Sequence, residues 1–210
     1  MKISTRRLQI IIKYFIKKYQ EASAHVKHVD VALNETVRLV TGCLKPTAVQ
    51  DVYTLAGIAP PRIRRRVAAE VERKKQISDL RNPMYHHVNT GPRLKSRRSF
   101  VQRVTSLQGK AEDRRTSLWR EALPANTGVH PTEELPPGHQ LPYTTWKTLN
   151  RLREGVKWRY DVDDVCDCGE VQTPQHLLAC PLMPSPCTKE DLVMCSHRAV
   201  QAAHFWDGKI

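Results

Sequence analysis

The sequence predicts a mainly α-helical protein: a small helical domain with basic helices, a partly irregular linker, and a C-terminal module of the zinc-knuckle kind. Apolar residues recur every three or four positions along several segments, and capping residues stand at the ends of those segments. Cysteine and histidine gather near the C-terminal end. No segment alternates apolar and polar residues over the length of a strand. These observations together favour helices over sheets.

Four helices are expected in the N-terminal half, each with an apolar stripe along one side. Their ranges are about 5–20, 29–40, 47–56 and 61–78. The second helix ends at Gly42, where a glycine cap is usual. The third begins with a capping box of Thr47 and Gln50 and stops at Gly57.

The rest of the chain is expected to be less regular. Residues 93–122 are partly helical and strongly basic, and three further helices are expected near 144–155, 174–179 and 188–206. We therefore divide the chain into four parts: an amphipathic N-terminal helix (1–24), a basic helical region (25–122), a proline-rich linker (123–142), and a final part with a helix, the knuckle and a last helix (143–210).

Positive charge is concentrated in the middle of the chain. Residues 60–120 hold 17 Lys/Arg and 5 Asp/Glu, whereas the chain as a whole has a net charge of +13. Such a segment predicts an anionic partner, most commonly RNA or DNA bound with weak sequence preference. The alternative is a basic helix face that is merely solvated. The candidate phosphate contacts are Arg62, Arg65, Arg66, Arg73, Lys74, Arg97 and Arg98.

Four residues near the C-terminus have the spacing C-x-C-x7-H-x3-C: Cys166, Cys168, His176 and Cys180. Zinc takes four tetrahedral nitrogen or sulfur ligands in closed structural sites. Gly169 supplies a permissive turn, and Thr173-Pro174 starts a short helix that places His176 and Cys180 on one side. We predict one structural zinc ion. The alternative is packed thiols without metal, since the C-x-C gap is shorter than usual.

No catalytic residues are predicted. The metal-dependent patterns H-E-x-x-H and H-x-E…P-C-x-x-C are absent. Residues 160–164 resemble the aromatic-x-Asp-Asp signature of polymerases, whose aspartates bind two metal ions. Here, however, two residues separate Tyr160 from Asp163, so we interpret the segment as an exposed acidic turn. The chain alone is not expected to be an enzyme.

The sequence also bears on location. No run of about 18 apolar residues predicts a membrane span. Residues 5–20 fit a core or partner-docking helix better than a signal peptide, with a membrane-surface or mitochondrial-targeting segment as the alternative. We expect reduced thiols and an intracellular protein, nuclear or cytoplasmic.

Several collinear strings resemble the region after the polymerase core in non-LTR retrotransposon proteins of the jockey type. They cover roughly residues 25–205 and lie at 25–35, 41–47, 55–61, 135–138, 146–153, 166–169 and 176–181. The resemblance implies a parent protein with endonuclease and RNA-directed DNA polymerase activities. It implies that this region is the thumb-like and post-polymerase part, ending in a cysteine-rich module, and that it helps to hold nucleic acid.

The polymerase motif and the endonuclease of that family are missing, residues 1–24 do not match, and the interval 155–158 is short. The expected function is therefore that of a non-catalytic part of a reverse transcriptase, binding nucleic acid through basic helices and stabilised by a zinc knuckle. Other parts of a retrotransposon protein are expected partners. Two alternatives remain: a degenerate, partly disordered fragment without selected function, and a protein-interaction module.

Overall fold

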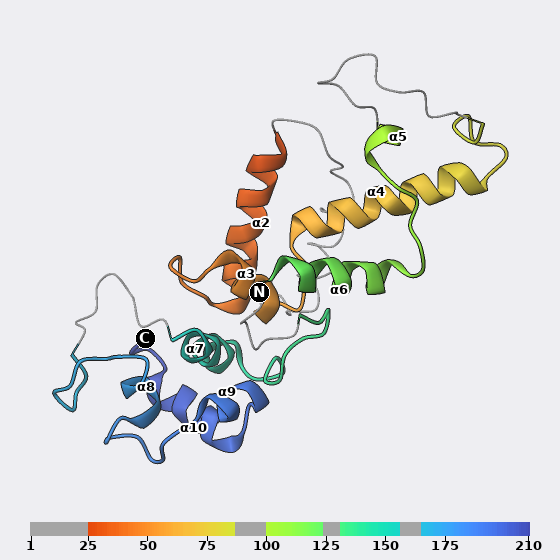
Figure 1. Ribbon diagram of the computed structural model, residues 1–210. Helices are drawn as coiled ribbons and strands as arrows, with labels where there is room; N and C mark the ends of the chain where they lie inside the picture. Colours follow the sequence, from red (N-terminus) through yellow and green to blue (C-terminus); the bar gives the residue numbers. More distant parts are fainter. Residues whose placement is uncertain (1–24, 87–99, 124–130, 156–164) are drawn as a thin grey trace. The chain divides into compact units, whose positions relative to one another are not determined.

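The computed structural model describes residues 25–86, 100–123, 131–155 and 165–210 (Figure 1). The predicted helix at 5–20, the cations Arg97 and Arg98, and the acidic turn at 160–164 lie outside these ranges. The chain forms two units. Among the described residues, unit 1 holds 29–58, 132–155 and 165–210, and unit 2 holds 25–28, 59–86, 100–123 and 131.

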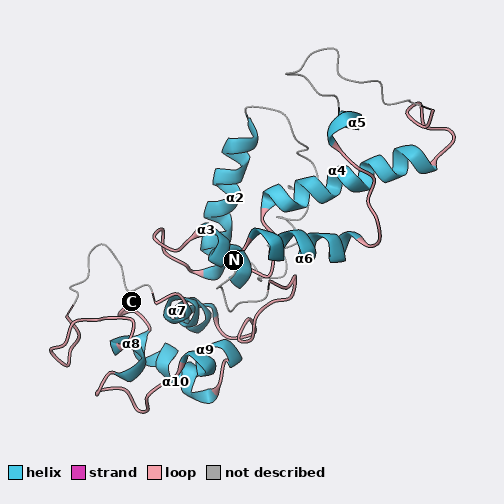
Figure 2. Ribbon diagram, in the orientation of Figure 1, coloured by secondary structure: helices cyan, strands magenta, loops and turns pink. Residues whose placement is uncertain are grey.

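The prediction of a mainly helical fold is confirmed. Within the described ranges all regular elements are helices (Figure 2). The β-structure described there is a single isolated antiparallel bridge, between Val165 and Val171. In the same ranges no helix is both long and apolar enough to cross a membrane.

Unit 1 is built from helices at both ends of its sequence. The helices that it contains, wholly or for most of their length, are α2 (His25–Thr41), α3 (Val49–Leu55), α7 (Tyr143–Arg153), α8 (His176–Ala179), α9 (Lys189–Met194) and α10 (His197–Trp206). Helix α7 packs against α9 and α10. Their shared core is apolar and includes Trp146, Leu149, Leu177, Leu192 and Trp206, together with the thiols of Cys166 and Cys180. The cysteine segment is thus part of a larger core.

Helix α7 also caps the C-terminal end of α2. The last carbonyl groups of a helix have no partners within the helix and need donors from elsewhere. One side of α7 supplies them, through Tyr143 Oη to Leu39 O (2.6 Å), Trp146 Nε1 to Val40 O (3.3 Å), Asn150 Nδ2 to Thr41 O (2.9 Å) and Arg151 Nε to Gly42 O (2.9 Å).

This approach requires a glycine where α2 ends. Gly42 has φ +73°, the left-handed region that side chains disfavour. A Cβ atom built there would lie 2.8 Å from the Cα of Lys147 in α7. Gly42 is therefore both the predicted helix stop and the point at which α7 comes close to the end of α2.

Unit 2 contains α4 (Pro61–Ser78), α5 (Phe100–Arg103) and α6 (Ala111–Ala122). Helices α4 and α6 pack against each other. The segment between α5 and α6 is also tied to α4, because Leu107 N donates to Glu70 O at 3.1 Å. Among the buried side chains of this unit are Val67, Leu118 and Trp119.

The structure differs from the sequence-based expectation at the last helix. The pattern predicts one helix from Thr188 to about Trp206, but the chain forms α9 and α10 with a break at Cys195. Cys195 has φ 52°, a left-handed conformation that ends α9, and Ser196 then caps α10 by accepting from Ala199 N. The hydroxyl of Ser196 donates to Asp191 at 2.6 Å, and this bond links the start of α10 to α9 across the break.

The predicted cap of the third helix is also wrong. Helix α3 follows Ala48, which makes no side-chain cap, so Thr47 and Gln50 do not form a capping box. Thr47 is buried, and its carbonyl accepts from Arg38 instead. The helix expected near 144–155 starts one residue earlier, at Tyr143, directly after its N-cap residue Pro142, which makes no side-chain cap bond.

The proposed four-part division also differs from this grouping. It places residues 25–122 in one region, whereas unit 1 combines 29–58 with 132–155 and 165–210. The physical reason is the contact between α2 and α7, which joins segments about one hundred residues apart in the sequence.

Candidate metal centre

A tight turn brings the first two cysteines together. Val165 and Val171 form the antiparallel bridge, and Cys166 N donates to Glu170 O at 2.8 Å. Gly169 N then donates to Cys166 O at 2.8 Å, with Gly169 at φ +87°. This confirms the permissive turn predicted at Gly169.

The other two candidate ligands come from α8 and its end. Thr173 Oγ1 accepts from His176 N at 3.0 Å, but the helix begins at His176, with Gln175 as its N-cap residue, and not at Pro174 as predicted. Helix α8 itself spans His176–Ala179, and Cys180 is its C-cap residue. Histidine and cysteine therefore stand one helical turn apart and face the cysteine turn.

All four ligand atoms lie within 4.8 Å of one another. The distance between the Sγ atoms of Cys166 and Cys180 is 3.7 Å, and Cys168 Sγ lies 3.5 Å from His176 Nε2. A tetrahedral zinc ion with Zn–S of about 2.3 Å and Zn–N of about 2.05 Å requires edges of about 3.8 Å and about 3.6 Å. Both measured edges match these values, so the cluster can hold a metal ion of this size.

The surroundings of His176 fix which nitrogen faces the cluster. His176 Nδ1 lies 2.9 Å from Glu170 Oε2, which leaves Nε2 for the cysteine side. The ring also meets Trp206 edge-on, at 6.2 Å between centroids. Trp206 Nε1 donates to Leu177 O at 2.9 Å. A carboxylate on the second ring nitrogen is the usual arrangement around a metal-bound histidine.

The electrostatics favour an anionic cluster. Burial raises the pKa of Cys166, but hydrogen bonds from the Cys168 backbone and from His176 outweigh burial and lower it to about 7. Burial raises the pKa of Cys180 to about 11. The pKa of His176 is raised, chiefly by its hydrogen bond with Cys166. A thiolate beside a thiol is thus stabilised before any metal binds, and thiolate is the form that binds metal.

The site is closed and no other such cluster is described. Cys166, His176 and Cys180 are buried and Cys168 is half-buried, so four protein ligands surround the centre. Four protein ligands are typical of structural zinc sites, whereas catalytic zinc sites keep one position open. Across the described ranges these residues are the one group of three or more His, Cys, Asp or Glu arranged to hold a metal ion.

The predicted phosphate contacts that lie among the described residues are all on α4 in unit 2. Arg62, Arg66 and Lys74 are exposed, while Arg73 is half-buried and lies 3.4 Å from Gln76 Oε1. Arg62, Arg66 and Arg73 are four and seven residues apart, which places them along one side of the helix. They form what we call the arginine stripe.

Arg65 does not belong to the exposed side. Only 7% of this residue is exposed, whereas the sequence pattern places it among the solvent-facing cations. The first half of α4 is buried on two sides, one with Ile63 and Val67 and one with Arg65 and Ala69. The apolar stripe marks only the first of these sides, because alanine and the stem of arginine carry little hydrophobic signal.

One cation of unit 2 was not expected at this surface. Arg114 of α6 pairs with Glu70 of α4, with Nε 3.1 Å from Oε2. The two residues are 44 positions apart. The pairing depends on how α4 and α6 pack, and no local pattern in the sequence signals it.

No protein-family model matches this chain, and no curated protein or solved structure matches it either. The resemblance to jockey-type retrotransposon proteins therefore stays a prediction from the sequence.

Proposed function

We propose that this chain is a non-catalytic nucleic-acid-binding module whose unit 1 is stabilised by one structural zinc ion. The observation that carries the metal assignment is the pair of cluster edges, 3.7 and 3.5 Å, which fit a tetrahedral ion. Three thiols and one imidazole favour zinc among the available divalent ions, because soft ligands in a tetrahedron suit it.

Nucleic acid is the partner that the basic unit supports. The arginine stripe and the exposed Lys74 lie in the segment of 17 Lys/Arg and 5 Asp/Glu. Guanidinium groups along one helix face can contact successive phosphates without reading bases. Binding of this kind has weak sequence preference and depends strongly on salt.

The sequence resemblance supports a wider context for the same activity. We assign the chain to the thumb-like, post-polymerase region of a reverse transcriptase, where it would hold nucleic acid for a polymerase core in another part of the protein. All six cysteines are free thiols, and free thiols persist best in a reducing compartment, which supports an intracellular location. The pure chain should not extend a primer on a template, and extension that Asp163→Asn abolishes would overturn the assignment.

A salt titration tests nucleic-acid binding. The full chain should bind a labelled duplex, with log Kobs falling steeply as log[salt] rises. The double variant Arg62→Gln/Lys74→Gln should lower that slope by roughly 0.9 for each lost phosphate contact. The double variant Lys189→Gln/Arg198→Gln removes the same charge from exposed positions in unit 1 and should leave the slope nearly unchanged. Absent binding at low salt, or an equal loss in both variants, would contradict the proposal.

A further inference from the structure

We propose that Arg66 of α4 and Arg114 of α6 form a fork that grips one backbone phosphate of the bound nucleic acid, with Glu70 as the residue that positions both. The inference rests on the nucleic-acid-binding function proposed above and names a binding site within it. It adds Arg114 and Glu70, which the sequence pattern did not place at this surface.

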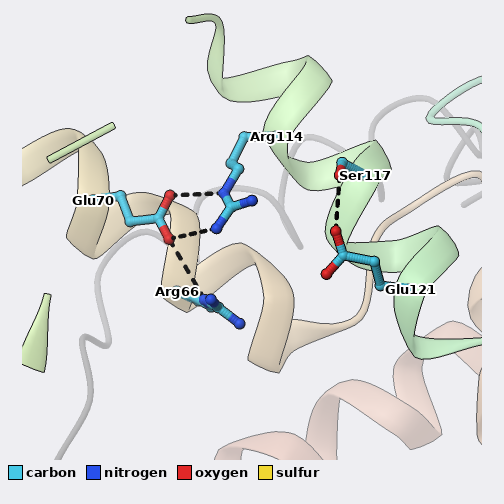
Figure 3. Close-up of polar contacts among 5 residues, drawn as sticks. All are labelled: Arg66, Glu70, Arg114, Ser117 and Glu121. Atoms are coloured by element: carbon cyan, nitrogen blue, oxygen red, sulfur yellow. Dashed lines mark hydrogen bonds and ion pairs between the residues drawn. The ribbon is translucent and has the colours of Figure 1, made fainter. Parts of the chain in front are cut away.

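One buried carboxylate holds two guanidinium groups (Figure 3). Glu70 Oε2 lies 3.1 Å from Arg114 Nε, and Glu70 Oε1 lies 3.5 Å from Arg114 Nη2 and 3.4 Å from Arg66 Nε. The Glu70 side chain is 5% exposed, whereas those of Arg66 and Arg114 are 59% and 32% exposed. The carboxylate is thus inside, and the cations reach solvent.

The charges do not balance within this group. Two guanidinium groups share one carboxylate, so the triad has a net charge of +1 and retains attraction for an anion. Each guanidinium has five N–H donors. Glu70 engages Nε and one Nη of Arg114 and the Nε of Arg66. Among the described residues no partner is seen for the remaining donors, and paired N–H groups of this kind match phosphate oxygens.

The packing of unit 2 prepares the fork in advance. The backbone of Glu70 is fixed because its carbonyl accepts from Leu107 N at 3.1 Å. The other acid in Figure 3, Glu121, accepts from Ser117 on its own helix at 3.1 Å. Holding flexible arginine side chains before binding reduces the entropy lost when a ligand binds.

The position of the fork fits the arginine stripe. Arg66 belongs to the stripe on α4, and Arg114 extends it onto the neighbouring helix. A phosphate held between the two helices would continue the contacts made by Arg62 and Arg73. The fork therefore binds a phosphodiester backbone, on the same face of unit 2 as the arginine stripe.

A variant without net charge change separates the fork from bulk charge. Glu70→Gln/Arg114→Gln leaves the net charge of the chain at its original value, because it removes one negative and one positive group. We expect the slope of log Kobs against log[salt] for a labelled duplex to fall by roughly 0.9, the value for one phosphate contact. The matched control is Asp79→Asn/Arg81→Gln, which removes an exposed ion pair of the same unit and should keep the slope.

A second, milder variant keeps the test valid if the double variant does not fold. Arg114→Lys keeps the charge but lacks the planar pair of donors, so affinity should fall several-fold at nearly constant slope. If the full chain binds with a steep slope and both Glu70→Gln/Arg114→Gln and Arg114→Lys, folded by circular dichroism, bind like it, the fork is wrong and the proposed function stands. If the unaltered chain binds no duplex at low salt, the proposed function fails and the fork with it.

Discussion

Glu170 orients the imidazole of His176 in the candidate metal centre. Its carboxylate lies 2.9 Å from His176 Nδ1, although the Glu170 side chain is 67% exposed. Removing such a partner typically weakens metal binding 10–100-fold. We expect Glu170→Ala to lower zinc affinity about tenfold or more, measured by competition with a coloured chelator. Glu190→Ala, an exposed glutamate of α9, is the control, and equal affinities of the two variants would contradict this role.

Glu154 gives unit 1 a pH dependence. Burial, together with the nearby charge of Asp51, raises the pKa of this carboxyl to about 7 against the opposing effect of Arg153. The folded state therefore binds the proton more tightly than the unfolded chain, whose pKa is near 4.5. The resulting stability is fully present below pH 4.5 and is lost as the pH rises towards 7.

Replacing this carboxyl should reveal the effect. We expect Glu154→Gln to be more stable than the unaltered protein at pH 8, by about 1 kcal/mol once solvent around a partly exposed group is allowed for. The advantage should shrink at pH 5, where the carboxyl is largely protonated. Urea unfolding of both proteins at the two pH values measures it, and a difference that does not change with pH would refute the shifted pKa.

The sequence predicted which four Cys and His residues form the cluster, but not the residue that supports His176. The cluster follows from the spacing of its residues: a tight chain turn brings Cys166 and Cys168 together, and a short helix places His176 and Cys180 on one side. Glu170 was not predicted, because its role depends on which way the imidazole of His176 turns. Arg65 was placed on the wrong side of α4 because only one of its two buried sides is marked by large apolar residues.

Among the elements, α7 acts as a cap for α2. Asn150 is fully buried, donates to Thr41 O at 2.9 Å and accepts from Arg153 Nη1 at 3.1 Å. Asn150→Ala removes the hydrogen bonds to Thr41 O and from Arg153 Nη1. A buried polar group left without a partner costs about 1–3 kcal/mol. We expect a loss of that size in the free energy of unfolding, measured with urea. Thr144→Ala, on the exposed side of α7, should change it by less than about 0.5 kcal/mol.

A loss no greater in Asn150→Ala than in Thr144→Ala would show that the capping bonds contribute little.

The presence of these helices was predictable from the sequence, since α2, α4 and α7 have strong periodic patterns. The caps at Thr47 and the break at Cys195 were not, because both depend on partners from other segments: Arg38 takes the Thr47 carbonyl, and Asp191 takes the Ser196 hydroxyl.

For the whole molecule, the cysteine segment and the helices of unit 1 share one core. Cys166 and Cys180 are buried in the same cluster as Trp146, Leu149 and Trp206. Lys209 also pairs with Asp167 at 2.9 Å, which ties the cysteine turn to the segment after α10. This grouping of distant segments was not predictable from local patterns, because it depends on packing between α7 and α10.

Metal removal should therefore affect more than the cysteine turn. We expect a chelator to speed amide hydrogen exchange in α7, α8 and α10, since metal binding contributes directly to folding free energy. Exchange in α4 and α6 of unit 2 should stay nearly unchanged and serves as the internal control. Faster exchange confined to residues 165–180 would contradict a shared core.

We propose that Cys166, Cys168, His176 and Cys180 bind one structural zinc ion. Elemental analysis of the reduced full chain, purified with zinc and dialysed, measures it most directly. We predict one zinc per chain, lost in Cys180→Ser and retained in Cys187→Ser, which alters another buried thiol outside the cluster. A chain that retains no zinc, or equal retention by both variants, would contradict the assignment.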